Sequence, residues 1–383
     1  MQTILKYKGS KSNFASEGSQ QYSILSERQV SMSHDVCTTM RKNNLSLDFG
    51  QQVSTIVHSR NYIADMWLYV ELNTADSDYC KDVGLQILDN LVLSYAGQEV
   101  ERLNYTPVMY ELLHNLVDKP MRDQLIKFHG GAKGVTPGDN GRVLIYLPFF
   151  FTSIHRQLRR GKCWSNGNSA TKLQITFETA QSSKFSAGTA SHKINSCQLW
   201  WEEMLLPANI ASSFTSSNSV TKFRPDFHVT ENIAVTAGVS QEINLSSILS
   251  AGNIKTLSFR FRATAATGAD ADCFQLGALS RPTSVVYKIN GVEFEEQLNS
   301  LEIDLEEYLQ NFRRREGETT LPYRYTFAES PNYASQIAGH IPSSHDNLTV
   351  TIVPSQTGFL DIVTTHMKRW VVGAQGRISK NDG

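Results

Sequence analysis

One short pattern occurs twice in the chain, about half its length apart. Gly97 opens the stretch GQEVERLN (97–104), and Gly291 opens GVEFEEQLN (291–299), which contains a single extra residue. An apolar segment precedes each copy, NLVLSYA or TSVVYKIN, and a glycine after such a segment indicates a turn between strands. We interpret the halves as tandem copies of one β fold. Chance likeness between two hairpins is the alternative, because x-G-x-E is an undemanding turn pattern.

An amphipathic helix is predicted after each copy of this turn. After the first copy, Thr106 can cap the helix and Pro107 suits its first position. After the second copy, Asn299 or Ser300 can take the capping role. The first apolar stripe consists of Met109, Leu112, Leu113, Leu116 and Val117. The second consists of Leu301, Leu305, Tyr308, Leu309 and Phe312.

The rest of the chain has the same β-rich character. YVELNTA ends at Ala75 and FRFRATA at Ala265, which is a second echo at nearly the same spacing. Short segments rich in Val, Ile, Tyr, Phe, Trp and Thr alternate with turn residues, and no strand–helix alternation is present. The sequence therefore predicts an all-β fold of two tandem eight-stranded antiparallel jelly rolls, which are β-sandwiches, with short inserted helices.

Composition along the chain predicts its division into domains. Residues 1–42 form an N-terminal arm that is rich in serine and poor in apolar periodicity. The first jelly roll is predicted over 43–207, and a serine-rich linker over 208–223 separates it from the second. The second jelly roll, with a C-terminal tail, is predicted over 224–383.

The stretch RVLIYLPFFFTS (142–153) holds nine consecutive apolar residues. This run is about half the length of a membrane-spanning helix, so it predicts a strand that protein covers on both faces. Pro148 cannot donate a ladder hydrogen bond, and we expect it at a strand end, an edge or a bulge. Phe149–Phe151 are expected on this strand, between the sandwich interior and a covering layer.

Charge and cysteine content argue against several classes of function. Lys and Arg number 36 against 37 Asp and Glu, so the net charge of -1 disfavours binding to nucleic acid through its phosphates. The five cysteines lie far apart without a C-x-x-C pair, which indicates neither a zinc site nor a disulfide framework. The N-terminal stretch lacks the apolar core of a secretory signal, so we expect synthesis and folding in a reducing cytosol.

Several clusters resemble chemical sites, but each has a simpler interpretation. HGGAKG (129–134) lacks the rest of a P-loop or lipase motif and suits a flexible turn. Trp200 and Trp201, together with Glu202 and Glu203, can form a sugar-stacking platform, or the two tryptophans can be buried strand aromatics at the end of a sandwich. The cluster of His155 with Arg156, Arg159 and Arg160 is expected on a solvated or intersubunit salt-bridge face. A second charged cluster lies beside or on the second predicted helix, where we expect exposure to solvent: Glu295, Glu296, Glu302, Glu306 and Glu307. We therefore predict no catalytic, cofactor-binding or metal-binding residues, and no enzymatic activity.

Three motifs together resemble the double jelly-roll major capsid proteins. They are the strand–turn–helix LVLSYAGQEVERLNYTPVMYELL, the apolar LPFFF after it, and the second turn YKINGVEF. This family is found in tailless icosahedral DNA viruses, both the membrane-containing phages and the nucleocytoplasmic large DNA virus lineage. The resemblance extends from about residue 43 to 375, and the chain is shorter than most eukaryotic-virus members.

The resemblance implies a structural protein of the virion. Three subunits with two like sandwiches each would form a pseudo-hexameric homotrimer that tiles an icosahedral capsid. Its implied partners are copies of itself, neighbouring capsomers and minor capsid or penton proteins, with no sequence-specific nucleic acid. The arm is a candidate for contact with a neighbouring capsomer or an internal viral membrane.

Two alternatives remain open at this stage. A two-domain jelly-roll protein that binds carbohydrate or a receptor would show the same strand patterns. A bicupin-like enzyme would also show them, but it would need a His/Glu metal cluster repeated in both halves, and the sequence shows no such repeat.

Overall fold

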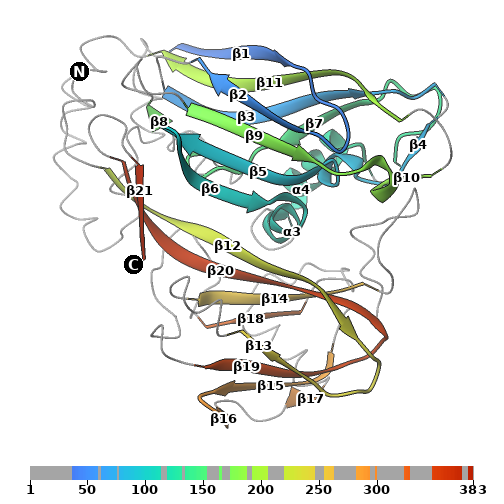
Figure 1. The fold of residues 1–383 in the computed structure, drawn as a ribbon, viewed down its shortest axis with the longest axis vertical. Coiled ribbons are helices and arrows are strands. Elements are labelled where there is room, and N and C mark those ends of the chain that lie inside the picture. The colour runs from blue at the N-terminus through green and yellow to red at the C-terminus, as the bar shows by residue number, and fades with distance from the viewer. Residues whose placement is uncertain are drawn as a thin grey trace. The chain divides into compact units, whose positions relative to one another are not determined.

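A computed structural model describes most of the chain, which divides into two compact units. The first lies mainly within Met1–Lys222, and the second comprises mainly Phe223–Ala266 and Cys273–Arg369. Figure 1 shows the strands of each unit. The described residues are 37–58, 62–75, 77–113, 119–131, 134–152, 164–165, 173–187, 192–205, 220–245, 254–262, 282–293, 298–299, 323–327, 347–372 and 378–382.

Eight principal strands build the first unit as two antiparallel sheets. One sheet has the order β1-β11-β3-β7 and the other β2-β9-β5-β6. The short strand β8 (Trp164–Ser165) pairs with β3, and β4 (Asp78–Tyr79) and β10 (Ser186–Ala187) form a separate two-stranded sheet. The eight are β1 (Cys37–Leu45), β2 (Gln52–Val57), β3 (Tyr62–Leu72), β5 (Leu88–Tyr95), β6 (Gln98–Asn104), β7 (Arg142–Tyr146), β9 (Leu173–Thr179) and β11 (Ile194–Leu205).

The second unit repeats this arrangement strand for strand. Its sheets have the orders β12-β20-β14-β18 and β13-β19-β15-β16, and β21 (Ile378–Asp382) and β17 (Leu298–Asn299) pair with β20 and β15. When the eight principal strands of each unit are numbered along the chain, the two units have the same strand order in both sheets. This order is that of a jelly roll. The strands are β12 (Val220–Val235), β13 (Gln241–Asn244), β14 (Ile254–Arg262), β15 (Pro282–Ile289), β16 (Val292–Glu293), β18 (Tyr323–Thr326), β19 (Leu348–Pro354) and β20 (Gly358–Val372).

The predicted fold of two tandem jelly rolls is therefore confirmed. Strand β1 begins at Cys37, inside the predicted arm, and β12 begins at Val220, inside the predicted linker. The four predicted domain limits themselves stay predictions.

The repeated turn has the same backbone geometry in both units. Ala96 and Gly97 have φ values of 54° and 78°, and Asn290 and Gly291 have 53° and 78°. Two successive residues with positive φ make the turn type whose twist matches a two-residue β-hairpin. The hairpins are β5–β6 and β15–β16, which close with the pairs Tyr95–Gln98 and Ile289–Val292.

The return strand of the first hairpin contains a bulge. Pairing passes there from Ser94–Glu99 to Leu93–Glu101, so one residue of β6 is left over. In the second hairpin, Lys288 pairs with Glu293 and Val285 with Leu298, and residues 294–297 lie outside the described residues.

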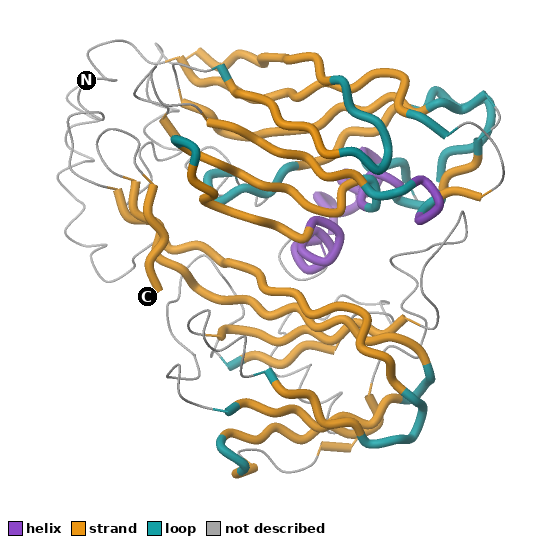
Figure 2. The backbone as a smooth tube through the Cα atoms, viewed as in Figure 1, coloured by secondary structure: helices purple, strands orange, loops and turns teal. Residues whose placement is uncertain are grey.

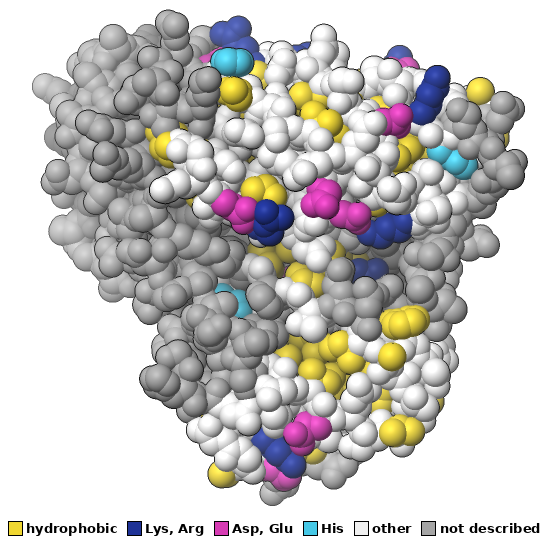
Figure 3. Space-filling model, in the orientation of Figure 1, with side chains coloured by type: hydrophobic (Ala, Val, Ile, Leu, Met, Phe, Trp, Pro, Cys, Tyr) yellow, Lys and Arg dark blue, Asp and Glu magenta, His cyan; other side chains and the backbone are white. Residues whose placement is uncertain are grey.

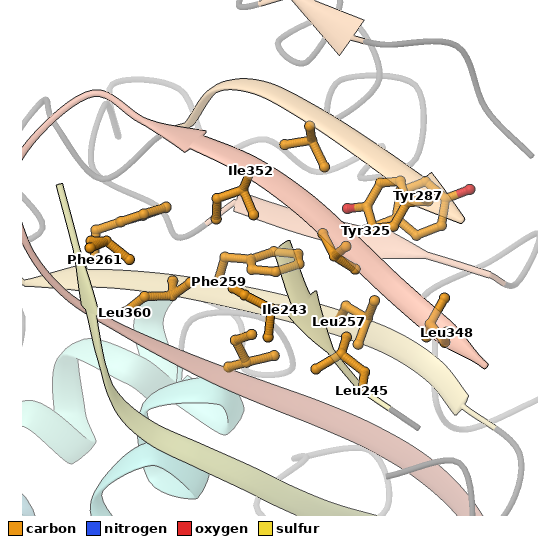
Figure 4. Close-up of a cluster of buried hydrophobic side chains, with 14 of the residues drawn as sticks. Ile243, Leu245, Leu257, Phe259, Phe261, Tyr287, Tyr325, Leu348, Ile352 and Leu360 are labelled. Carbon is orange, nitrogen blue, oxygen red and sulfur yellow. The ribbon is translucent and has the colours of Figure 1, made fainter. Parts of the chain in front are cut away.

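Each unit encloses an apolar core between its two sheets. In β9 the burial alternates strictly along Leu173–Thr179, because one face of the strand points inward and the other outward. The core of the second unit draws on both of its sheets (Figure 4). Phe259 of β14 and Tyr287 of β15 are 0% exposed there. Burying an aromatic side chain of this kind stabilises the fold by roughly 1.5–3 kcal/mol.

The phenylalanine run does not lie on a strand, contrary to the prediction. Strand β7 ends at Tyr146, and Phe149–Phe151 form a turn in which all three side chains are at most 3% exposed. Pro148 lies just beyond the strand end, as expected. A buried turn explains the lack of alternation, because its apolar side chains need not point to opposite faces.

The first predicted helix also differs from its expected form. Helix α3 (Tyr105–Glu111) has Asn104 as its N-cap residue, and Pro107 is its third residue. Thr106 does not cap, because its hydroxyl donates to the carbonyl oxygen of Leu85 at 2.7 Å. The helix is not amphipathic, since all seven of its residues are buried.

Helix α4 (Lys119–Phe128) follows α3 in the first unit (Figure 2). Two short 3-10 turns, Val83–Leu85 and Ser182–Lys184, complete the described helical segments. Leu116, Val117 and the second predicted helix lie outside the described residues.

Candidate functional site

The two tryptophans singled out in the sequence point to opposite faces of one sheet. Trp201 of β11 lies inward opposite Met66, and it is 5% exposed. Trp200 lies on the outward face and is half-buried. Lys42 of β1 is directly opposite Trp200, and Tyr69 of β3 lies on the same outward face. We call the outward-facing residues Met40, Lys42, Asn44, Tyr69, Gln198 and Trp200 the aromatic strip.

Side chains from the two strands that flank β11 enclose the ring of Trp200. The Tyr69 ring stacks on it at 5.0 Å between centroids and an interplanar angle of 5°. The Nζ atom of Lys42 lies 4.1 Å from the ring centroid, which is a cation–π contact. The indole N–H donates to Gln198 Oε1 at 2.9 Å, and Gln198 Nε2 donates to Asn44 Oδ1 at 3.0 Å. A sugar could therefore stack on Trp200 only by displacing Tyr69 or the exposed Lys42 side chain from the ring.

The neighbouring glutamates do not form a catalytic pair. Glu203 is 3% exposed, and its Oε2 atom accepts a hydrogen bond from Arg41 Nε at 2.6 Å. This ion pair joins β1 to β11. Glu202 lies on the other face of the strand, opposite Met40, so the two carboxyl groups diverge.

The described part of the HGGAKG stretch, residues 129–131 and 134, follows the end of α4, and residues 132–133 lie outside the described residues. His129 is 0% exposed, and burial lowers its pKa to about 3, so the imidazole is neutral at physiological pH. The carbonyl oxygen of His129 accepts the Gly84 N–H at 2.9 Å, and a Cβ atom at Gly84 would lie 3.0 Å from His129 Cα. His129 therefore contributes to packing against Gly84, and the interpretation of the stretch as a flexible turn stays a prediction.

Three buried hydrogen bonds fix the phenylalanine turn and α3, and sequence analysis missed them. Glu101 accepts the backbone N–H of Phe150 at 2.9 Å, and Tyr105 donates its hydroxyl to the carbonyl oxygen of Tyr146 at 2.7 Å. The third is the bond from Thr106 to Leu85. Burial raises the pKa of Tyr105 well above its usual value, which keeps the phenol protonated. Period-two alternation puts Glu101 on the inward face with Leu103, and that is the one signal that could have revealed it.

The described residues contain no group of three or more His, Cys, Asp or Glu that could hold a metal ion. Within the same residues, no helix has the length and apolarity needed to cross a membrane. Cys80 and Cys197 are buried cysteines outside any disulfide, the Cys80 sulfur accepts a hydrogen bond from Gln86 Nε2 at 3.0 Å, and burial raises the pKa of Cys197 to about 12. On the face shown in Figure 3, acidic and basic side chains lie beside one another rather than gathering in one basic patch. His155 with its arginines, and the glutamates from Glu295 to Glu307, lie outside the described residues.

No protein-family model matches the sequence, and no curated protein matches it either. Solved structures, in contrast, share its fold along most of its length. PBCV-1 VP54, in a crystal structure fitted into a cryo-EM reconstruction of the virophage Sputnik, is 13% identical with a TM-score of 0.70. This similarity covers 92% of the present chain and 98% of VP54.

Two further structures are similar over comparable lengths. The mavirus major capsid protein is 9% identical with a TM-score of 0.57, and the similarity covers 90% of both chains. The Faustovirus major capsid protein is 8% identical with a TM-score of 0.57, covering 87% of this chain and 90% of the other. At such low identity these likenesses establish the fold, which is the double jelly roll.

Proposed function

We propose that the chain is a major capsid protein, a structural component of an icosahedral virion. The observation that carries this proposal is the strand order that both units share. Because each chain contains two similar sandwiches, three chains can present six similar sandwiches to their neighbours in a shell. The fold likeness to major capsid proteins of viruses, over about nine-tenths of the chain, supports the same conclusion. Neither half needs an active site for this role.

In the proposed mechanism, three copies associate into a trimer with six similar sandwiches. Duplication thereby lets a threefold object fill a nearly sixfold place in a shell. Interfaces of this permanent kind bury on the order of 2,000 Å² or more and have apolar centres. A net charge of -1 avoids strong repulsion among many copies packed side by side.

Contacts within and around the trimer form the finer part of the proposal. The arm over 1–42 would contact a neighbouring capsomer or an internal membrane, and minor capsid or penton proteins would bind the capsomers. We keep 43–207 and 224–383 as the limits of the two jelly rolls, with 208–223 as the linker. Deletion of residues 1–25 tests the arm, since unchanged assembly of the shortened chain would remove that role.

The oligomeric mass of the purified chain tests the proposal most directly. We expect light scattering to give three times the 42.9 kDa of one chain. A monomer at micromolar concentration would contradict the capsid role and favour an isolated binding protein. Electron microscopy of concentrated material should then show flat arrays or closed shells built from blocks of pseudo-hexagonal outline.

The enclosed ring of Trp200 speaks against the carbohydrate-binding alternative at this position, because sugar stacking needs an open aromatic face. A glycan-binding assay on the purified wild-type chain and on the Trp200→Ala variant checks this point. We expect the substitution to abolish no glycan binding. Metal analysis of the same material checks the bicupin alternative. Stoichiometric metal in both halves would favour that alternative.

A further inference from the structure

The outward face of the sheet β1-β11-β3-β7 has two zones. Near β7, Trp67 packs against Phe128 of α4 at 5.9 Å and against Tyr146 at 4.8 Å, both edge to face. This zone is the covered part of the sheet. Near β1, the aromatic strip ends in Met40, which is 51% exposed and is one of three large hydrophobic side chains exposed among the described residues. The strip is thus a mixed surface, in which the exposed Met40, Lys42 and Asn44 lie beside the half-buried rings of Tyr69 and Trp200, and it is open to a partner.

The aromatic strip is already ordered in the single chain. Tyr69, Lys42 and Gln198 each hold Trp200 from a different side, as described above. A partner that docks here therefore loses little side-chain entropy on this surface. Trp and Tyr are among the residues that dominate interface energies.

The chain itself carries a group whose chemistry matches the strip. At the tip of the β15–β16 hairpin, Val292 is 69% exposed, and the side chain of Glu293 is 55% exposed while its Oε1 atom forms an ion pair with Lys288 Nζ at 3.4 Å. The tip is rigid, because Asn290 exchanges two 2.8 Å hydrogen bonds with Asn347, one from each backbone N–H. It therefore offers an apolar side chain next to an acid, where the strip offers Met40 next to Lys42.

We propose that the aromatic strip of one copy receives the β15–β16 hairpin tip of a neighbouring copy, with Val292 against Met40 and Glu293 beside Lys42. The inference rests on the proposed function, which requires copies of the chain to associate. A closed ring of three needs two different surfaces on each copy, because a contact between unlike surfaces can repeat around a threefold axis. The strip belongs to the first unit and the tip to the second, so the contact alternates first and second units around the ring.

Charge reversal on the full-length chain tests this contact. Sedimentation velocity over a concentration series first measures trimer dissociation of the wild-type chain. We expect Lys42→Glu and Glu293→Lys each to raise the dissociation constant by about tenfold or more, because each places like charges in contact. The double variant K42E/E293K should return to within about threefold of wild type, because each contact then pairs opposite charges again.

Matched variants control for net charge and for folding. Lys193→Glu and Glu242→Lys change exposed residues outside both surfaces, and we expect them to leave the dissociation constant unchanged. Val292→Asp introduces a charge at an exposed turn, so it should weaken the trimer without altering the thermal unfolding of the single chain. Thermal unfolding is measured for each charge variant, and it verifies in particular that Lys42→Glu leaves the first unit folded.

The outcomes separate this inference from the proposed function. A monomeric wild-type chain would overturn both. Trimers that tolerate each single reversal would overturn this inference alone, and so would single reversals that the double variant fails to rescue.

Discussion

Leu93 in the first unit and Tyr287 in the second occupy the same place in the fold, 194 residues apart in the sequence. Each lies on the strand before the repeated turn, and each is 0% exposed. A leucine and a tyrosine differ greatly in volume, so the two cores are packed by different side chains around the same strand order. What the halves share is therefore the alternation, the pairing order and the turn, while the individual core contacts are specific to each half.

The largest effect should come from emptying these two equivalent positions. Leu93→Ala and Tyr287→Ala should each lower the free energy of unfolding by about 3–5 kcal/mol, because each leaves a cavity in a core. Urea denaturation of the purified chain measures the change. Leu93→Tyr sharpens the comparison, and we expect it to cost about 1–3 kcal/mol through overpacking. A stability equal to wild type for Leu93→Tyr would mean that the two cores are interchangeable after all.

A second loss of unfolding free energy is expected at Glu101, which lies on the strand after the first turn. Glu101→Ala removes the acceptor of the buried Phe150 N–H, so we expect a loss of about 3 kcal/mol in unfolding free energy. Glu99→Ala is the matched control, since Glu99 is exposed and pairs with Arg102 at 2.7 Å on the surface. The control should cost less than about 1 kcal/mol. Equal losses for the two variants would show that the phenylalanine turn does not depend on Glu101.

The phenylalanine turn and α3 show where prediction from sequence stops. Alternation and turn residues are local, and they sufficed for the all-β fold, for the repeat and for the turns at Gly97 and Gly291. The acceptor of the Phe150 N–H, in contrast, is 49 residues away, and the carbonyl oxygen that binds Thr106 is 21 residues away. A chain segment whose polar groups are satisfied at such separations need not follow local propensity, which is why the phenylalanines form a turn and Thr106 does not cap.

The aromatic strip was within reach of sequence analysis only in part. Adjacent tryptophans on a strand point to opposite faces, so Trp200 and Trp201 could have been assigned one outward and one inward position. Lys42 and Tyr69 come from β1 and β3, and their contact with Trp200 depends on the register of both strands with β11. Register between strands far apart in sequence is set by the packed core, so the single sequence does not reveal the enclosed ring.

Acid should weaken the first unit through His129. The folded pKa is about 3 against 6.5 for the free side chain, so the unfolded chain binds the proton first as pH falls. Stability from the neutral imidazole is complete above pH 6.5 and is lost progressively down to pH 3, at about 1.4 kcal/mol per pH unit. At pH 5 we expect a loss of about 2 kcal/mol relative to pH 7.

Thermal unfolding between pH 7 and pH 5 measures this loss, with His129→Leu as the comparison. The variant removes the titrating group, so its loss of stability between pH 7 and pH 5 should be smaller than that of wild type by about 2 kcal/mol. An identical pH dependence for wild type and variant would assign the acid sensitivity to other groups.

The smallest predicted effect concerns the first residue of the repeated turn. The two copies have different residues there, Ala96 and Asn290, in the same left-handed conformation. Ala96 and Asn290 share a left-handed backbone with φ near 54°, which is unfavourable for alanine and better tolerated by asparagine. Ala96→Asn should therefore stabilise the chain by about 1 kcal/mol, whereas Asn290→Ala should destabilise it by about as much or more, since Asn290 also bonds Asn347. Urea denaturation resolves both signs, and because both turns are exposed at their tips, packing should contribute little. Destabilisation by Ala96→Asn would mean that the residues around the two turns differ enough to outweigh the shared backbone conformation. The two turns would then have the same geometry but different energies.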